Sequence, residues 1–85
     1  MSHVFSERVV LVTGGSRGIG RAISVALGRA GAKVAINYVK DGAAAHSTLT
    51  DVEDAGGSGG IYQADVASEP AVQEMAINVE HTLGP

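Results

Sequence analysis

The sequence predicts an α/β fold in which helices cover a doubly wound parallel sheet. Short apolar runs alternate with longer segments of helical periodicity, as in a β-α-β-α-β-α chain with right-handed crossovers. A glycine-rich turn joins the first apolar run to the first helical segment. The chain has 85 residues, which is enough for one small domain. In the doubly wound order, these strands form the 3-2-1 part of the sheet.

The first strand and helix flank the glycine turn. Val9–Thr13 is an apolar run that suits a strand buried on both faces of a parallel sheet. Helical periodicity then extends over Gly18–Arg29, and Gly31 is placed to end the helix. The apolar face predicted for this helix consists of Ile19, Ile23, Ala26, Leu27 and Ala30.

The second strand is predicted over Lys33–Val39, where Val34, Ala35 and Ile36 are apolar in succession. Asp41 is suited to cap the helix that follows, which runs to about Ala55. The expected inner face of that helix is Ala45, Leu49 and Val52. The glycine-rich segment 56–60 is expected to be a flexible connector.

The third strand is predicted over Ile61–Asp65. Ser68 can cap a third helix, which tolerates Pro70 in its first turn. Gly84-Pro85 ends this helix. The expected apolar stripe consists of Val72, Met75, Ala76, Val79 and Leu83.

The glycine turn indicates a phosphate site, because it brings backbone N–H groups and the positive end of a helix dipole to one point. A Walker-type loop would need Lys and Ser or Thr after its second glycine, but Arg21-Ala22 follow Gly20. Kinase or ATPase chemistry is therefore not expected. The G-x-G-x-x-G fingerprint is also incomplete, because Ile23 stands at its third glycine. A turn that merely joins strand to helix is the remaining alternative.

The pattern that is present is T-G-x-x-x-G-x-G, from Thr13 to Gly20. It resembles the short-chain dehydrogenase/reductase family, and the whole stretch resembles the members that reduce 3-oxoacyl thioesters. The resemblance implies a Rossmann-type fold over nearly the whole chain, and a dinucleotide held at this turn. The residues that it places at the cofactor are Gly14, Ser16, Arg17, Gly18, Ile19 and Gly20.

The end of the second strand predicts which dinucleotide binds. NAD-binding folds normally carry Asp or Glu there, which accepts hydrogen bonds from the ribose hydroxyls and would repel a 2′-phosphate. Here the uncharged Asn37 and Tyr38 occupy this region, while Ser16 and Arg17 in the glycine turn supply donors for a phosphate. The sequence therefore predicts NADP(H) rather than NAD(H), although Asp41 nearby opposes phosphate binding.

Asp65 and Val66 follow the third strand. In the family that this chain resembles, an Asp at this place binds the adenine amino group and the next residue's backbone contacts the ring. The alternative is that Asp65 orders the turn into Ser68. The two roles are compatible.

The catalytic residues of the family are not found in this chain. The family uses a serine, a tyrosine and a lysine four positions after the tyrosine, but Gly42 follows Tyr38 at that spacing and Val66 follows Tyr62. We therefore expect residues 1–85 to be the NADP-binding portion of a single-domain reductase, a fragment that is inactive and marginally stable alone. The alternatives are a non-catalytic dinucleotide-binding module and an inert truncated product.

The amino-acid composition excludes several other kinds of binding site. Without cysteine there is no disulfide or thiolate site, and the three histidines are too far apart for a metal site. A net charge of −3 without a basic stripe argues against nucleic-acid binding. No apolar stretch reaches the ~18 residues of a membrane span, so a cytoplasmic protein is expected. The resemblance implies a small carbonyl substrate and a homo-oligomeric parent enzyme.

Overall fold

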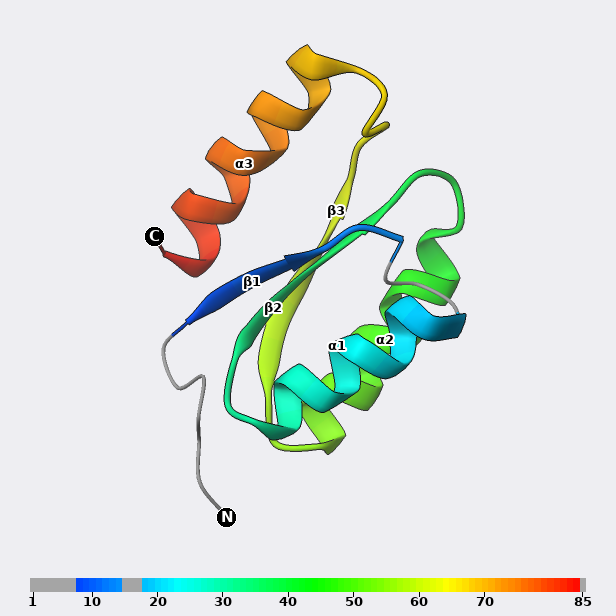
Figure 1. Cartoon of the computed structure of the whole chain (residues 1–85), viewed down its shortest axis with the longest axis vertical. Coiled ribbons are helices and arrows are strands. Elements are labelled where there is room, and N and C mark those ends of the chain that lie inside the picture. Colours follow the sequence, from blue (N-terminus) through cyan, green and yellow to red (C-terminus); the bar gives the residue numbers. More distant parts are fainter. Residues whose placement is uncertain (1–7, 15–17, 85) are drawn as a thin grey trace.

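The computed structural model describes residues 8–14 and 18–84, in which strands and helices alternate along the chain (Figure 1). This alternation confirms the predicted order of elements. The elements are β1 (Val9–Val12), α1 (Gly18–Arg29), β2 (Lys33–Tyr38), α2 (Gly42–Asp54), β3 (Ser58–Gln63) and α3 (Glu69–Leu83).

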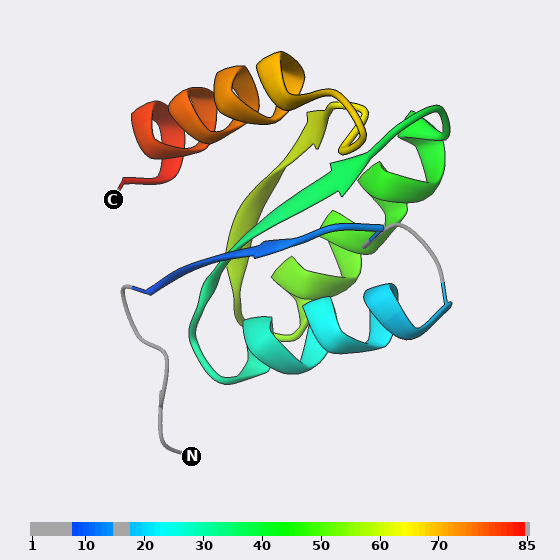
Figure 2. The ribbon, with the colours of Figure 1, turned by 45° about the horizontal axis from the view of Figure 1, so that its top comes forward.

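The strands form one parallel sheet in the order β1-β2-β3. In the register, Val10 lies opposite Val34, and Ile36 lies between Val12 and Ile61. Figure 2 shows α1 and α2 on one face of the sheet and α3 on the other. This arrangement confirms the predicted fold class and the 3-2-1 part of a doubly wound sheet.

The central strand β2 supplies the middle of both core layers. Val34 and Ile36 are fully buried toward α1 and α2, where Val52 packs on them. Ala35 is buried toward α3, against Met75 and other apolar residues of that helix. Burial on both faces explains why β2 is an unbroken apolar run instead of an alternating one.

The helix starts follow from local capping. The Asp41 carboxylate accepts a hydrogen bond from the Ala44 N–H at 2.9 Å, and the Ser68 hydroxyl accepts one from the Ala71 N–H at 3.4 Å. Both caps confirm the prediction, and Pro70 lies in the first turn of α3 as expected. A proline is tolerated there because the first N–H groups of a helix have no intrahelical partner.

The expectation of a flexible connector at 56–60 is wrong, because β3 begins at Ser58 and ends at Gln63. Close packing explains the glycines. A Cβ on Gly57 would lie 2.5 Å from the Cα of Gly28, and one on Gly59 would lie 2.0 Å from the backbone O of Val34. These glycines therefore let the start of β3 approach α1 and β2 more closely than any side chain permits.

The apolar face predicted for α1 is confirmed only in part, because Leu27 packs against the core but the isoleucines do not. Ser24 and Gly28 are buried, whereas Ile19 and Ile23 are 81% and 47% exposed. A Cβ on Gly28 would lie 2.8 Å from Cγ1 of Val52 in α2. The packed face is thus the one whose small residues let the two helices come together, and the isoleucines face away from it.

Candidate functional site

The candidate site lies where the strands end. Because all three strands are parallel, their carboxyl ends share one edge of the sheet. The structure brings Thr13-Gly14, Tyr38 and Ala64-Asp65 to this edge, and α1 begins beside it at Gly18. Ligands of open α/β sheets bind in this position.

The described part of the glycine turn has the backbone that its sequence requires. Gly14 and Gly18 have φ values of 65° and 56°, in the left-handed region that favours glycine. The first turn of α1 holds no acidic residue. No carboxylate of this turn therefore competes with an anion for the positive end of the helix dipole. Ile19 and Gly20 lie in this turn, whereas Ser16 and Arg17 lie outside the described residues, so their contacts stay a prediction.

The two residues predicted at the end of β2 face opposite sides of the sheet. The Asn37 side chain is 2% exposed and donates to backbone oxygens on the α3 side. The sequence analysis placed Asn37 beside the ribose of the cofactor. Its side chain instead faces the protein interior. The reason is the two-residue period of a strand. Tyr38 instead packs with the core on the α1–α2 side, so the uncharged side chain on the side of the glycine turn is Tyr38.

At the end of β3, the structure supports the turn-forming role of Asp65. Its carboxylate Oδ1 accepts the Ala67 N–H at 2.9 Å, and its backbone oxygen accepts the Ser68 N–H at 2.9 Å. Asp65 and Val66 are both exposed at the sheet edge. Their contact with an adenine stays a prediction, and it is compatible with this turn.

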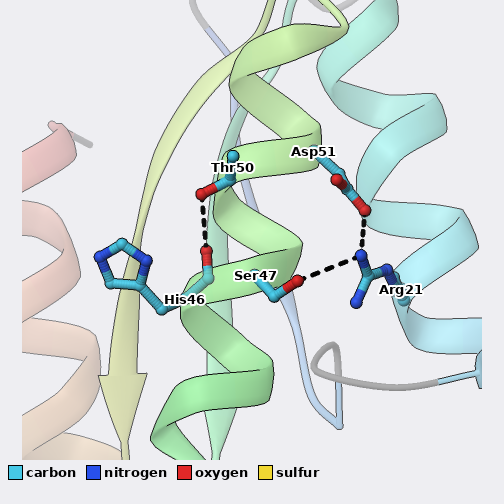
Figure 3. A network of polar contacts seen from close by, with 5 residues as sticks. All are labelled: Arg21, His46, Ser47, Thr50 and Asp51. Atoms are coloured by element: carbon cyan, nitrogen blue, oxygen red, sulfur yellow. Dashed lines mark hydrogen bonds and ion pairs between the residues drawn. The ribbon is translucent and has the colours of Figure 1, made fainter.

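Arg21 lies in the first turn of α1, beside the glycine turn, but its guanidinium is directed at α2 (Figure 3). It forms an ion pair with Asp51 and donates to the Ser47 hydroxyl at 3.3 Å. The pair joins residues 30 positions apart in the sequence. No local pattern links two residues at that separation, so sequence reasoning had no signal for it.

Replacing Asp51 with Asn is expected to lower the free energy of unfolding by only about 0.2–1 kcal/mol, because exposed ion pairs are screened by solvent. Both side chains are more than a third exposed, at 37% and 40%. Urea unfolding followed by circular dichroism measures the loss. Asp54→Asn is the matched control, since it removes the same charge near the same end of α2. A loss above about 2 kcal/mol would contradict this solvent-screened account of the pair.

Residues 8–14 and 18–84 contain neither a cluster of metal ligands nor a helix that could span a membrane. Within these ranges, no three His, Asp or Glu side chains gather in a way that could hold a metal ion. No helix among them combines the length and apolar character needed to cross a membrane.

The parallel sheet, the glycine turn and the helix that starts from it define a nucleotide-binding domain of the Rossmann type. Residues 8–85 match the family described as short chain dehydrogenase. The chain therefore belongs to the short-chain dehydrogenase family.

Individual relatives agree with this assignment. The chain is 42% identical over 78 residues to 1-cyclohexenylcarbonyl-CoA reductase of Streptomyces collinus, covering 92% of this chain and 28% of the relative. It superimposes on a dehydrogenase/reductase from Sinorhizobium meliloti 1021 with a TM-score of 0.92 and 35% identity, covering 98% of this chain and 33% of that one. The angucycline C-6 ketoreductase LanV with bound NADP gives a TM-score of 0.87 and 36% identity, with coverage of 98% and 32%.

The chain thus spans about a third of the length of these relatives. Their names point to different substrates, so the comparisons establish the family and not the narrower resemblance to 3-oxoacyl reductases.

Proposed function

We propose that this chain is the NADP-binding part of a short-chain reductase that converts a carbonyl group, of the 3-oxoacyl thioester kind, to an alcohol. The main support for this proposal is the set of residues at the carboxyl edge of the sheet. There the left-handed glycines Gly14 and Gly18 open a helix without an acidic first turn. The side chain at the end of β2 on the same side is the uncharged Tyr38. A cofactor with a 2′-phosphate suits an uncharged residue at this position.

Each group at this edge has a proposed role. The N–H groups of the first turn of α1 hold the pyrophosphate, as helix N-termini do. Arg17 and Ser16 bind the 2′-phosphate, because a guanidinium fork and a hydroxyl both donate to its oxygens. Asp65 accepts a hydrogen bond from the adenine amino group, and the backbone of Val66 contacts the ring. NADPH, when bound, supplies the hydride for the reduction.

The proton donor must come from residues outside this chain, because neither Tyr38 nor Tyr62 is followed by Lys at the family's spacing. We accordingly propose that the chain works within a larger protein, since it covers about a third of the S. collinus reductase and of the S. meliloti enzyme. Within the described residues, β1 pairs with β2 alone. Leu11 of β1 is 42% exposed beside an apolar groove of about 230 Å³ that α3 also lines. A further strand paired with β1 would cover Leu11 and this groove.

Calorimetric titration of the chain with NADPH and with NADH tests the proposal. We expect NADPH to bind at least about 10-fold more tightly, because a charge-assisted contact with the 2′-phosphate contributes about 1.5–3 kcal/mol. Arg17→Ala should reduce this preference while leaving NADH binding nearly unchanged. Tighter binding of NADH by the unmodified chain would overturn the NADP assignment.

The same titration bears on the alternatives. If neither nucleotide binds, the chain is an inert piece of the family fold. If NADPH binds, the remainder of the reading frame decides between a reductase and a binding module. A serine and a Tyr-x-x-x-Lys there favour the reductase.

A further inference from the structure

Asn37 is a buried polar residue near the end of the central strand. Its side chain is 2% exposed and lies on the face of the sheet that α3 covers, next to Ala35 and Met75. A primary amide is costly to bury unless its hydrogen-bonding groups have partners. The partners of Asn37 therefore indicate what its amide does.

The amide nitrogen Nδ2 of Asn37 donates toward three acceptors. The backbone oxygen of Ala64 lies at 3.0 Å, that of Tyr62 at 3.3 Å, and the sulfur of Met75 at 3.4 Å. An amide NH₂ has two hydrogens and cannot donate fully to all three acceptors, and the shortest of the contacts is the one to Ala64. The side chain thus joins β2 to the end of β3.

Ala64 is the residue at which regular pairing between β2 and β3 stops, since Tyr38 and Gln63 are the last partners in the register. Its N–H donates to the Tyr38 backbone oxygen at 3.0 Å, and its own oxygen accepts from Asn37. Both backbone groups of Ala64 are therefore held by neighbouring residues of β2. The next residue, Asp65, starts the turn toward α3 from this fixed point.

We propose that Asn37 is a positioning residue for the adenine end of the cofactor. It acts through the backbone of Ala64, which sets the place and direction of Asp65 and Val66. This inference rests on the proposed function, in which Asp65 accepts a hydrogen bond from the adenine amino group.

The chemistry of the amide fits this role better than other side chains of similar size. A leucine would leave the oxygen of Ala64, a residue only 7% exposed, without this donor. An aspartate would direct carboxylate oxygens at the backbone oxygens of Ala64 and Tyr62. The lack of charge at Asn37 is thus a requirement of the protein interior, separate from the choice between NADP and NAD.

The test compares NADPH with its hypoxanthine analogue, in which oxygen replaces the adenine amino group. The oxygen that replaces the amino group cannot donate to Asp65, so the unmodified chain should bind NADPH about 10-fold more tightly, as expected for a hydrogen bond to a charged group. Asn37→Ser should reduce that preference to about 2-fold or less, near the value for Asp65→Asn. The affinities are measured by calorimetry on the 85-residue chain.

Thr48→Val is the matched control, because Thr48 is another fully buried polar residue and lies on α2. It should lower the melting temperature and leave the preference for the amino group unchanged. Asn37→Leu is a more severe variant, and if it fails to fold then Asn37→Ser carries the comparison.

The outcomes separate this inference from the function on which it rests. Equal binding of the two nucleotides by the unmodified chain means that the proposed Asp65 contact is wrong, and with it the role of Asn37. A clear preference that survives in a less stable Asn37→Ser chain retains the proposed function but overturns the positioning role.

Discussion

Gly59→Ala is expected to lower the free energy of unfolding by about 3 kcal/mol or more. A Cβ at Gly59 would lie 2.0 Å from the backbone oxygen of Val34 and 2.9 Å from its carbonyl carbon. Val34 is fully buried in the central strand, so neither atom can move without breaking the sheet. Since a domain of this size is stabilised by only about 4–13 kcal/mol, much of its stability would be lost.

Urea unfolding followed by far-ultraviolet circular dichroism measures this loss. Gly42→Ala is the matched control, because a Cβ at Gly42 would approach the Tyr38 ring no closer than 3.4 Å. Alanine in the first turn of α2 is also a better helix former than glycine, by up to about 1 kcal/mol. If 56–60 were a flexible connector, as the sequence suggested, Gly59→Ala would change the free energy of unfolding in the opposite direction. In a flexible connector, alanine would stabilise the chain by reducing the entropy of its unfolded state.

Tyr38→Asp is expected to reverse the cofactor preference. Tyr38 ends β2 on the face that α1 and α2 cover, so a carboxylate there would stand on the side of the predicted 2′-phosphate site. It would repel that phosphate and accept hydrogen bonds from a free ribose hydroxyl. We expect the affinity for NADPH to fall by about 10- to 100-fold, as two like charges in partial contact with solvent imply, and that for NADH to be retained or raised.

Calorimetric titration with both nucleotides checks this result. Thr50→Asp is the control, because it adds the same charge at an exposed position of α2. Asn37→Asp should instead prevent folding, since its carboxylate would be buried against the backbone oxygens of Tyr62 and Ala64. If Tyr38→Asp kept the full preference for NADPH, Tyr38 would not be the discriminating position.

Features that depend on neighbouring residues in the sequence were predicted well. The bounds of α1 agree with the prediction, because a glycine begins the helix and the periodicity of its residues ends before Gly31. The caps Asp41 and Ser68 also agree, because a capping bond spans only three residues. The left-handed backbone at Gly14 suits the glycine turn on which the family resemblance rests.

Features that depend on distant residues were predicted less well. The ends of β1 and β3 differ from the prediction by one to three residues, since pairing with β2 sets them. The apolar pattern of α1 suggested that Ile19 and Ile23 face inward, but the close approach of Gly28 to Val52 of α2 decides the packed face. A pattern of apolar residues does not identify a helix face that packs through glycine, because glycine has no apolar side chain to count.

The sequence by itself determined the alternation of strands and helices, the glycine turn and the family, because these follow from backbone preferences and short-range hydrogen bonds. Only the tertiary structure decided that Asn37 faces α3 while Tyr38 faces α1 and α2, that Arg21 pairs with Asp51, and that Gly59 lies against Val34. The hydrogen bond of Asn37, the ion pair of Arg21 and the contact at Gly59 each involve a residue more than twenty positions away along the chain. Contacts at that range are set by how the elements pack, which no local pattern specifies.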